Sequence, residues 1–334
     1  MTRPAQHTRP TIDDVARLAG VSRATTSRAL NGQPGASAAA RERVAHAVAQ
    51  LGYRADAAAR ELASGRRRTI DLVVYTCEDD IAWLGADPYY GRIMAGLLPA
   101  LDREGLPLHI RRVDPADAPA QIDAIARQVT AGAVLVSVPA ELATRFVRRT
   151  RGPVVTLTPA GVVAPTVSAD NRGGARAAIA HLHALGRRRI AAVHGPESNA
   201  CAAARRLGHH DAAAELGIEI VEAEGFFDRE GGYRATTALL EAHPDLDALF
   251  VAQDLMGAGA LQALTDRGRR VPQDVALIGF DDSIAASVAN PPLTTIRQPV
   301  EEMAATAIDA LLSGSALPGW TASFTCDLVQ RASA

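Results

Sequence analysis

The chain of 334 residues contains no lysine, and all 35 of its basic residues are arginine. A GC-rich genome would account for this bias, and the absence excludes Walker-type phosphate loops and Schiff-base enzymes, because both need lysine. Cysteine is scarce as well: Cys77, Cys201 and Cys326 lie far apart, with neither a C-x-x-C pair nor zinc-finger spacing. We therefore expect no cofactor, no metal and a reducing, cytoplasmic compartment.

Long apolar runs are also missing. No stretch reaches the roughly 18 residues of a membrane-spanning helix, and no apolar signal segment with a cleavage site opens the chain. Hydrophobic residues nevertheless make up 48% of the sequence, which is enough for the cores of about two ordinary domains. The sequence predicts a soluble, intracellular protein without a membrane partner.

The formal net charge of −2 is small, but the charges are unevenly distributed. Residues 1–69 contain 12 arginines against 5 acidic residues, a balance of +7, whereas the remainder has a balance of −9. A basic first fifth on an acidic body predicts a polyanionic partner for that part alone.

The basic part begins with two short helical patterns in TIDDVARLAGVSRATTSRALNG, residues 11–32. Thr11 and Asp14 form a capping box for the first helix, and apolar residues then recur at i, i+3, i+4 and i+7. A Gly-Val turn follows. Ser22 is a suitable N-cap for a second helix, which an Asn-Gly pair stops after Leu30.

The second helix has two different sides. We expect Thr26, Ala29 and Leu30 to pack against the first helix, whereas Arg23 and Arg28 lie on the opposite side. A helix-turn-helix has this arrangement, because its second helix enters the major groove of DNA, where arginine can bind guanine O6 and N7. The alternative is an ordinary helical hairpin with a solvated charged face.

From Ile70 onward, short β-branched runs alternate with longer amphipathic stretches; TIDLVVYT, GAVLVSV, RRIAAVHG and DVALIGFDD are typical of the strands. About eight such units exceed one comfortable sheet, so we predict two α/β lobes, each a doubly wound parallel sheet. Ligands of open α/β sheets bind at the carboxyl ends of the strands, which here predicts a cleft between the lobes.

The long motifs carry a family resemblance. TIDDVARLAGVSRATTSRALNG resembles the headpiece of the lactose/galactose-repressor (LacI/GalR) family of bacterial transcription factors, and GYRADAAAREL resembles the hinge helix of that family. SADNRGGARAAIAHLHALGRRRIAAVHGP is similar to its middle segment, and VAQDLMGAGALQAL, VPQDVALIGFDDS and PPLTTIRQPVEEM are similar to its signature blocks. The resemblance covers nearly the full chain and implies a dimer that binds a palindromic operator, with a type I periplasmic-binding-protein-like core that senses a small molecule.

The resemblance also implies boundaries. We expect a helix-turn-helix headpiece at 1–54, a hinge helix and linker at 55–69, and an effector-binding and dimerisation core at 70–334. Within the core, the first lobe is expected at about 70–168 and 298–321, and the second at about 169–297 and 322–334.

In the DNA-binding part, the resemblance assigns base-contacting positions to the second helix and a minor-groove wedge to the hinge. The implied DNA-binding residues are Arg23, Ala24, Thr25, Ser27, Arg28, Asn31 and Leu62. The hinge departs from the family pattern, because Ala55-Asp56 stands where Pro-Asn is usual. Thr26 likewise stands where the family usually has valine, which puts a hydroxyl in the headpiece core.

In the sensor, the resemblance implies an arginine and a carboxylate for polar ligand groups, with aromatic rings beside them. The implied effector-binding residues are Tyr89, Tyr90, Asn199, Cys201, Arg205, Phe227, Gln253 and Asp281. Gln253 stands where many sugar-binding members have asparagine. A sugar or glycoside is the expected effector, and a nucleoside or purine-like molecule is the alternative.

An enzyme is the main alternative of another class. GAGALQ, at residues 257–262, partly imitates a dinucleotide fingerprint, but its glycines fall inside a predicted helix, and no HExxH, GxSxG or spaced carboxylate pair occurs. His181, His183, His209 and His210 are most simply helix-surface or packing residues. A periplasmic receptor would need a secretion signal and no headpiece, so we expect a regulator that is not an enzyme.

Overall fold

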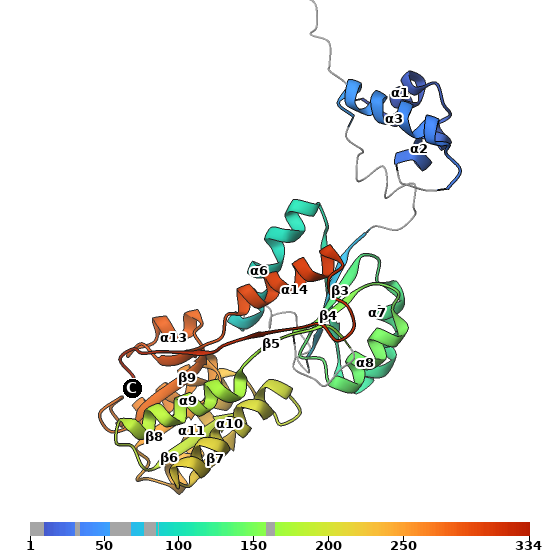
Figure 1. Cartoon of the computed structure of the whole chain (residues 1–334). Coiled ribbons are helices and arrows are strands. Elements are labelled where there is room, and N and C mark those ends of the chain that lie inside the picture. The colour runs from blue at the N-terminus through green and yellow to red at the C-terminus, as the bar shows by residue number, and fades with distance from the viewer. Residues whose placement is uncertain (1–9, 31–33, 54–67, 77–84, 86, 158–163) are drawn as a thin grey trace, which may run out of the picture. The chain divides into compact units, whose positions relative to one another are not determined.

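The computed structural model describes residues 10–30, 34–53, 68–76, 85, 87–157 and 164–334. The chain divides into two compact units, Met1–Arg67 and Arg68–Ala334. The expected hinge falls largely on residues 54–67, which lie outside the described residues together with Asn31. Figure 1 shows the three helices of the first unit and the two sheets of the second.

The first unit contains α1 (Ile12–Ala19), α2 (Arg23–Leu30) and α3 (Ala38–Leu51). The expected capping box is present, because the Thr11 hydroxyl accepts from the Asp14 amide and the Asp14 carboxylate accepts from the Thr11 amide at 2.9 Å. Gly20, in the left-handed conformation, ends α1, and the Ser22 hydroxyl accepts from the amide of Thr25. Helix–turn–helix geometry therefore follows from local capping.

The core of this unit is small. Val15, Ala19, Val44 and Ala47 are buried, and the apolar residues of α2, with Val48 and Leu51 of α3, pack against them. The side of α2 that was expected to face α1 thus packs against this core.

The second unit contains two six-stranded sheets and their covering helices. Its first-lobe elements are β1 (Ile70–Tyr75), α6 (Pro88–Glu104), β2 (Leu108–Val113), η1 (Pro115–Asp117), α7 (Ala118–Gln128), β3 (Gly132–Val136), α8 (Ala140–Arg149), β4 (Val154–Thr156), β5 (Thr166–Ala169), α14 (Val300–Ser313) and β11 (Thr321–Phe324). Its second-lobe elements are α9 (Asn171–Ala184), β6 (Ile190–His194), α10 (Ala200–Leu216), β7 (Ile220–Glu224), α11 (Arg229–Ala242), β8 (Ala248–Val251), α12 (Asp254–Asp266), β9 (Ala276–Asp281), α13 (Ile284–Val288), β10 (Thr294–Arg297) and β12 (Asp327–Val329).

Both sheets have the doubly wound order that the alternating pattern predicts. The first runs β11-β5-β4-β3-β1-β2 and the second β12-β10-β9-β8-β6-β7, and all pairs are parallel except the edge pair β10–β12. Along β1, Leu72 and Val74 face α6 and α14, whereas Val73 faces α7 and α8, so helices cover both faces. The predicted α/β architecture is confirmed.

The chain crosses between the lobes three times, after β5, after β10 and after β11. Because β11 pairs with β5 through Phe324, the third crossing lies three residues beyond the expected position 321. In the second lobe, α9 packs on α10 and α11 on α12. Gly208 of α10 allows the first contact, since a Cβ there would collide with the carbonyl oxygen of Arg172.

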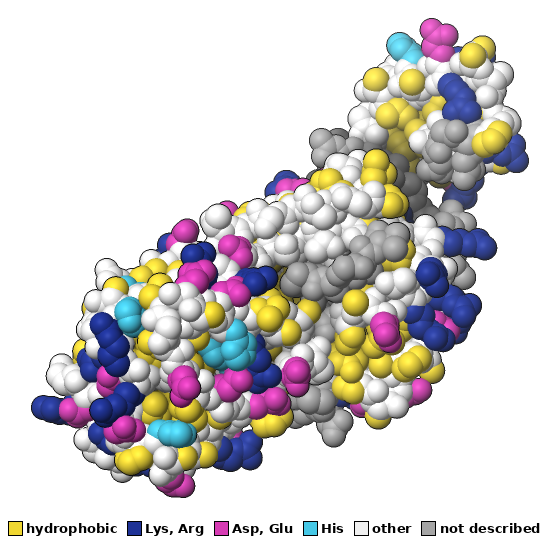
Figure 2. Space-filling view, turned by 60° about the horizontal axis from the view of Figure 1, so that its bottom comes forward, with side chains coloured by type: hydrophobic (Ala, Val, Ile, Leu, Met, Phe, Trp, Pro, Cys, Tyr) yellow, Lys and Arg dark blue, Asp and Glu magenta, His cyan; other side chains and the backbone are white. Residues whose placement is uncertain are grey.

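Charged side chains of both signs mix over the second lobe, at the lower left of Figure 2. Several ion pairs join such side chains in this lobe, among them Arg172–Asp211, Arg176–Glu215 and Arg267–Glu241. Among the described residues, no helix combines the length and the apolar character needed to cross a membrane.

The buried hydroxyl of Thr26 yields a test of the headpiece core. Thr26 is fully buried, and its hydroxyl donates to the carbonyl oxygen of Ser22, which already accepts from the Thr26 amide. We expect Thr26→Val to keep the packing and to change the stability of the headpiece by less than about 1 kcal/mol, with stabilisation the more favoured sign. Thr26→Ala, which leaves a cavity, should destabilise by about 1–2 kcal/mol. Equal unfolding temperatures of the two variants, measured by calorimetry, would contradict this account.

Candidate DNA-binding surface and effector site

The exposed side of α2 carries the residues that the sequence assigned to DNA. Arg23, Ala24 and Arg28 are exposed, and Thr25 and Ser27 are half-buried. Arg23 pairs weakly with Asp13 of α1, at 3.6 Å between Nη1 and Oδ2. The guanidinium groups and the small Ala24 are thus accessible together, as a helix entering a major groove requires. Asn31 and Leu62, assigned to the same function, lie outside the described residues.

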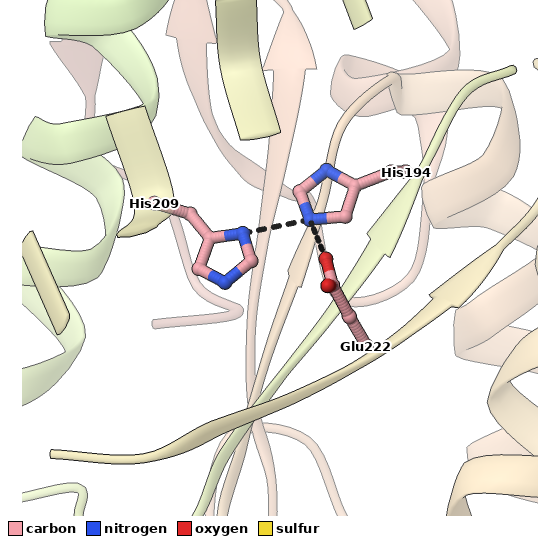
Figure 3. Close-up of side chains that lie close together, drawn as sticks. All are labelled: His194, His209 and Glu222. Carbon is pink, nitrogen blue, oxygen red and sulfur yellow. Dashed lines mark hydrogen bonds and ion pairs between the residues drawn. The ribbon is translucent and has the colours of Figure 1, made fainter. Parts of the chain in front are cut away.

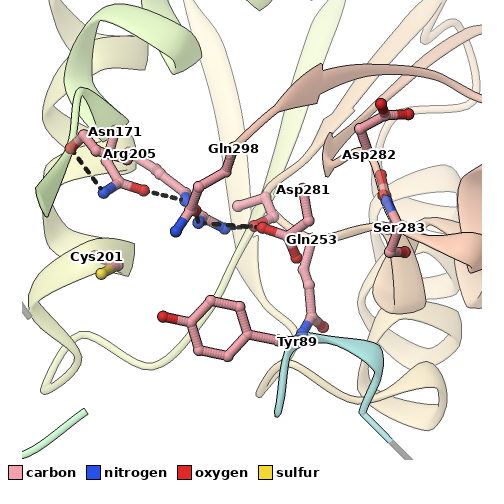
Figure 4. A network of polar contacts seen from close by, with 12 residues as sticks. Tyr89, Asn171, Cys201, Arg205, Gln253, Asp281, Asp282, Ser283 and Gln298 are labelled. Carbon is pink, nitrogen blue, oxygen red and sulfur yellow. Dashed lines mark hydrogen bonds and ion pairs between the residues drawn. The ribbon is translucent and has the colours of Figure 1, made fainter. Parts of the chain in front are cut away.

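In the second unit, Arg205 of α10 is the centre of a buried polar network, drawn in Figure 4. Its Nε donates to Asn171 Oδ1 at 2.8 Å, and its Nη1 donates to the carbonyl oxygen of Ala252. Its Nη2 donates to Gln298 Oε1 at 2.8 Å and, at a longer 3.3 Å, to Asp281 Oδ1. The guanidinium also lies over the ring of Phe280, 3.7 Å from its centroid. Arg205 therefore joins the ends of three strands to two helices.

Asp281 ends β9 and is 5% exposed. Burial raises the pKa of its carboxyl, and the nearby guanidinium groups of Arg205 and Arg92 offset part of this shift. Its φ of 110° lies in a region that side chains rarely adopt, so the turn after β9 is strained at this residue. The contacts of Asp281 with Arg205 and Arg92 hold this conformation in place.

Gln253 lies at the start of α12 and connects the two lobes. Its Nε2 donates to Asp87 Oδ2 at 3.2 Å, and Asp87 is also the N-cap of α6. Its Oε1 is buried and has no hydrogen-bond partner among the described residues. A buried amide oxygen without a donor is costly, and a hydroxyl group that donates to it would remove this cost.

Tyr89 lies on the first-lobe side of this network. In Figure 4 its ring lies between Cys201 and Gln253, with the hydroxyl on the side of Cys201. Burial, and secondarily the neighbouring Cys201, raise the pKa of Tyr89 well above its ordinary value, so the phenol stays protonated. Tyr90 contacts the Tyr89 ring edge-on, with centroids 5.6 Å apart.

Two of the expected effector-binding residues also stabilise the local structure. Asn199 is the N-cap of α10, and its Oδ1 accepts from the amides of Cys201 and Ala202. Phe227 lies across Gly195, where any Cβ would collide with the phenyl ring. Both residues shape the loops at the carboxyl ends of β6 and β7.

The structure adds participants that the sequence analysis did not assign. Arg92 of α6 donates to the carbonyl oxygens of Asp281 and Gln298, at 2.6 and 2.9 Å, and forms a two-bond ion pair with Glu301. Gln298 and Asn171 complete the bonds of Arg205. Gln298 and Asn171 lie within the quoted motifs PPLTTIRQPVEEM and SADNRGGARAAI, which is the available signal; Arg92 follows DPYYG with no motif of its own.

Asp254 lies just behind the network and is fully buried. Its carboxylate accepts from the amide of Ser283 at 2.7 Å and from the hydroxyl of Thr295 at 2.6 Å. Burial, followed by the charge of Asp281, raises the pKa of Asp254 to about 7. Gly279 leaves the space for this carboxylate, because a Cβ there would collide with Oδ1.

Comparison with known proteins identifies the same two parts. Residues 11–56 match the family model described as "Bacterial regulatory proteins, lacI family", and residues 179–333 match the one described as "Periplasmic binding protein-like domain".

Relatives match over nearly the whole chain. The HTH-type transcriptional regulator CelR of Thermobifida fusca is 37% identical over 327 residues, which cover 93% of this chain and 94% of that protein. The HTH-type transcriptional regulator GalR of Escherichia coli (strain K12) is 34% identical over 332 residues, covering 96% and 94%.

Solved structures agree. A transcriptional regulator CelR–cellobiose complex has a TM-score of 0.73 at 33% identity and covers 98% of this chain and 100% of that chain. The lac repressor dimer bound to operator and the anti-inducer ONPF has a TM-score of 0.75 at 28% identity, covering 98% and 99%.

The raised pKa of Asp254 predicts a pH effect on stability. The folded chain keeps a proton on this carboxyl up to about pH 7, whereas an unfolded chain releases it near its ordinary pKa, so the stabilisation falls as the pH rises from about 4 to about 7. Asp254→Asn mimics the protonated form, so it should not lose this stabilisation as the pH rises. We expect the difference in unfolding free energy between Asp254→Asn and the wild type to change in favour of the variant by on the order of 2–4 kcal/mol from pH 4 to pH 8.

The measurement is denaturant unfolding of the core across this pH range. His194 and His209 are buried and have lowered pKa values, so their contribution to stability rises with pH. Both proteins contain them, so this contribution cancels in the difference between Asp254→Asn and the wild type. The exposed Asp102→Asn should retain the wild-type profile. Parallel profiles for wild type and Asp254→Asn would show that Asp254 does not hold this proton.

Proposed function

The chain belongs to the lacI family of bacterial regulatory proteins, and from that premise we propose that it is a sugar-responsive repressor that binds a palindromic operator as a homodimer. It is a helix-turn-helix transcriptional regulator. The observation that carries the sugar proposal is the buried Arg205–Asp281–Gln253 arrangement in a chain similar to the CelR–cellobiose complex.

The proposed operator contacts follow from the exposed side of α2. Arg23 and Arg28 flank Ala24, whose small side chain lets the helix approach the base edges closely. Arg17 of α1 is also exposed, on the helix that crosses the DNA backbone in this motif. Arg28 thus supplies specificity and Arg17 supplies phosphate affinity. DNA binding places the protein in the cytoplasm, and its work is regulation rather than catalysis.

The proposed dimer uses apolar residues that the single chain leaves exposed. Leu98 of α6 is 48% exposed and borders a surface hollow between α6 and β2. Ile284 and Val288 of α13 are 63% and 70% exposed in the second lobe. Exposed apolar side chains on both lobes support an interface that runs along the whole core.

The proposed effector is a sugar or glycoside. Its hydroxyl groups can donate to Gln253 Oε1 and Asp281 and accept from Arg205, and Tyr89 covers an apolar face. The long contacts Arg205–Asp281 and Gln253–Asp87, at 3.3 and 3.2 Å, are the ones that a hydroxyl most easily replaces. A nucleoside or purine-like ligand would need a ring stacked flat against Tyr89, and this remains the second candidate.

The mechanism depends on contacts between the lobes. Gln253–Asp87 and Arg92–Asp281 tie the N-terminal half of α6 to the second lobe. A ligand that replaces the Gln253–Asp87 contact and retains the Arg92–Asp281 contact changes the preferred angle between the lobes. In a dimer, this angle sets the separation of the two hinges and hence the fit of the headpieces to the operator. The effector must favour one angle by several kcal/mol to switch occupancy.

The DNA assignment is tested with Arg28→Ala. The operator is first isolated by selection from random duplexes. We expect a loss of about 1–3 kcal/mol in operator affinity and a smaller loss on random DNA, because a base contact is removed. Arg17→Ala is the matched control, and it should weaken both kinds of DNA alike and lower the salt slope by about 1. Equal losses on both kinds of DNA for Arg28→Ala would remove Arg28 from the base-contacting set.

The effector assignment is tested with Arg205→Lys and Gln253→Ala. Calorimetric titration with cellobiose, ribose and adenosine identifies the ligand class, and a response to adenosine alone would favour the nucleoside alternative. For the ligand that binds, both variants should lose at least about tenfold in affinity, which is 1.4 kcal/mol, and keep the operator affinity of the ligand-free protein. Arg176→Lys, on the exposed side of α9, should behave as wild type. Wild-type ligand affinity in both variants would place the pocket elsewhere.

A further inference from the structure

A cluster of metal-ligand side chains lies in the second lobe, outside the proposed effector site. His194 ends β6, His209 lies on α10 and Glu222 lies on β7. In Figure 3 the two imidazole rings lie next to each other, with a nitrogen of each directed at the other and the carboxylate below His194 and beside His209. His194 Nε2 is 2.8 Å from His209 Nδ1 and 3.4 Å from Glu222 Oε2. The three ligand atoms all lie within 4.8 Å of one another.

Both histidines are completely buried, and Glu222 is not. Burial lowers the pKa of His194 to about 3 and that of His209 to about 4, so both rings are neutral at physiological pH. Neutral imidazole is the form that binds metal ions, but the proton that lies between the two rings must first move to the outer nitrogen of its ring, so that His194 Nε2 and His209 Nδ1 both present a lone pair.

Hydrogen bonding between the two rings alone leaves this pair poorly satisfied. One N–H and one lone pair face each other, and His194 Nδ1 and His209 Nε2 have no partner among the described residues. Each such buried nitrogen lowers the stability of the fold, and two apolar side chains would fill the same space without that cost. Both of these nitrogens lie on the outer sides of the rings, whereas His194 Nε2 and His209 Nδ1 converge with the Glu222 carboxylate, as the ligand atoms of a metal site do.

We propose that His194 Nε2, His209 Nδ1 and Glu222 Oε2 bind one zinc ion. Two imidazoles and one carboxylate form a ligand set that zinc accepts, with water in the fourth position. Tetrahedral zinc with bonds of about 2.0–2.1 Å needs ligand atoms about 3.3 Å apart. The His194–Glu222 distance of 3.4 Å already fits, and the two histidine nitrogens must separate by about 0.5 Å. His209 Nδ1 and the carboxylate, which lie within 4.8 Å of each other, must approach. The side chain of Glu222, 34% exposed, provides the route from solvent.

The surroundings hold the carboxylate in place. Arg206 Nε lies 3.2 Å from Glu222 Oε2, and His210 Nε2 lies 3.8 Å from Oε1. The Arg206 contact holds the Glu222 carboxylate beside the two rings and would be displaced by an ion on Oε2, whereas the His210 contact is too long for a hydrogen bond. His210 is half-exposed and lies outside the three-atom cluster, so it is a matched control for the buried pair.

The proposal is tested by titrating the full-length protein, with any polyhistidine tag removed and under a non-thiol reductant, with zinc chloride in a calorimeter. We expect one zinc ion per chain and a rise in melting temperature. Glu222→Gln, at a partly exposed position that does not threaten folding, should lower the affinity at least tenfold. His194→Leu should abolish the binding. Cobalt should give the visible absorption of a tetrahedral site in the wild type and not in these variants.

His210→Gln should bind zinc and cobalt as the wild type does. If the wild type binds no zinc, or if Glu222→Gln binds it with unchanged stoichiometry and affinity, the site does not exist. Loss of binding in His210→Gln with retention in Glu222→Gln would place the metal on surface histidines and overturn the proposal. None of these readouts uses operator or effector, so they are independent of the proposed regulatory function.

Discussion

The buried guanidinium of Arg205 is the interaction on which the carboxyl ends of the strands of the second lobe depend. It connects α10 to the end of β8 through Ala252, to the end of β9 through Asp281 and to the crossing after β10 through Gln298. A buried cation is tolerated only when its donors are satisfied, and here the carboxylate and the carbonyl oxygens supply that compensation. The same bonds therefore position the strand ends around the proposed effector site.

Much of this arrangement could be predicted from the sequence, because it depends on local signals. The capping box at Thr11, the alternating strand and helix patterns and the position of Asp281 at a strand end all follow from spacing of a few residues. The family motifs added Arg205 and Gln253. In the structure Arg205 bonds to Asp281 in a buried network and Gln253 bonds to Asp87, while the ligand roles of both residues remain predictions.

The remaining parts could not be predicted because they depend on how distant elements meet. Arg92 reaches the carbonyl oxygens of residues about 190 and 206 positions later, and no spacing rule covers such a contact. His209 was expected to be a surface or packing residue, and it is completely buried against His194. A helical pattern of alanines and histidines does not state which histidine faces the sheet, because alanine fits either side. The packing of α10 on β6 decides it.

Helix α10 is common to the two polar sites of the second lobe. Arg205 and His209 are four residues apart and so lie on one side of the helix, one turn from each other. Their ligands have different consequences. All three proposed zinc ligands belong to the second lobe, so zinc binds equally well at every angle between the lobes; it stabilises the lobe by mass action and does not select a conformation. An effector between Tyr89 of the first lobe and Gln253 of the second contacts both lobes. Only a ligand with such contacts has the differential affinity that a regulatory switch requires.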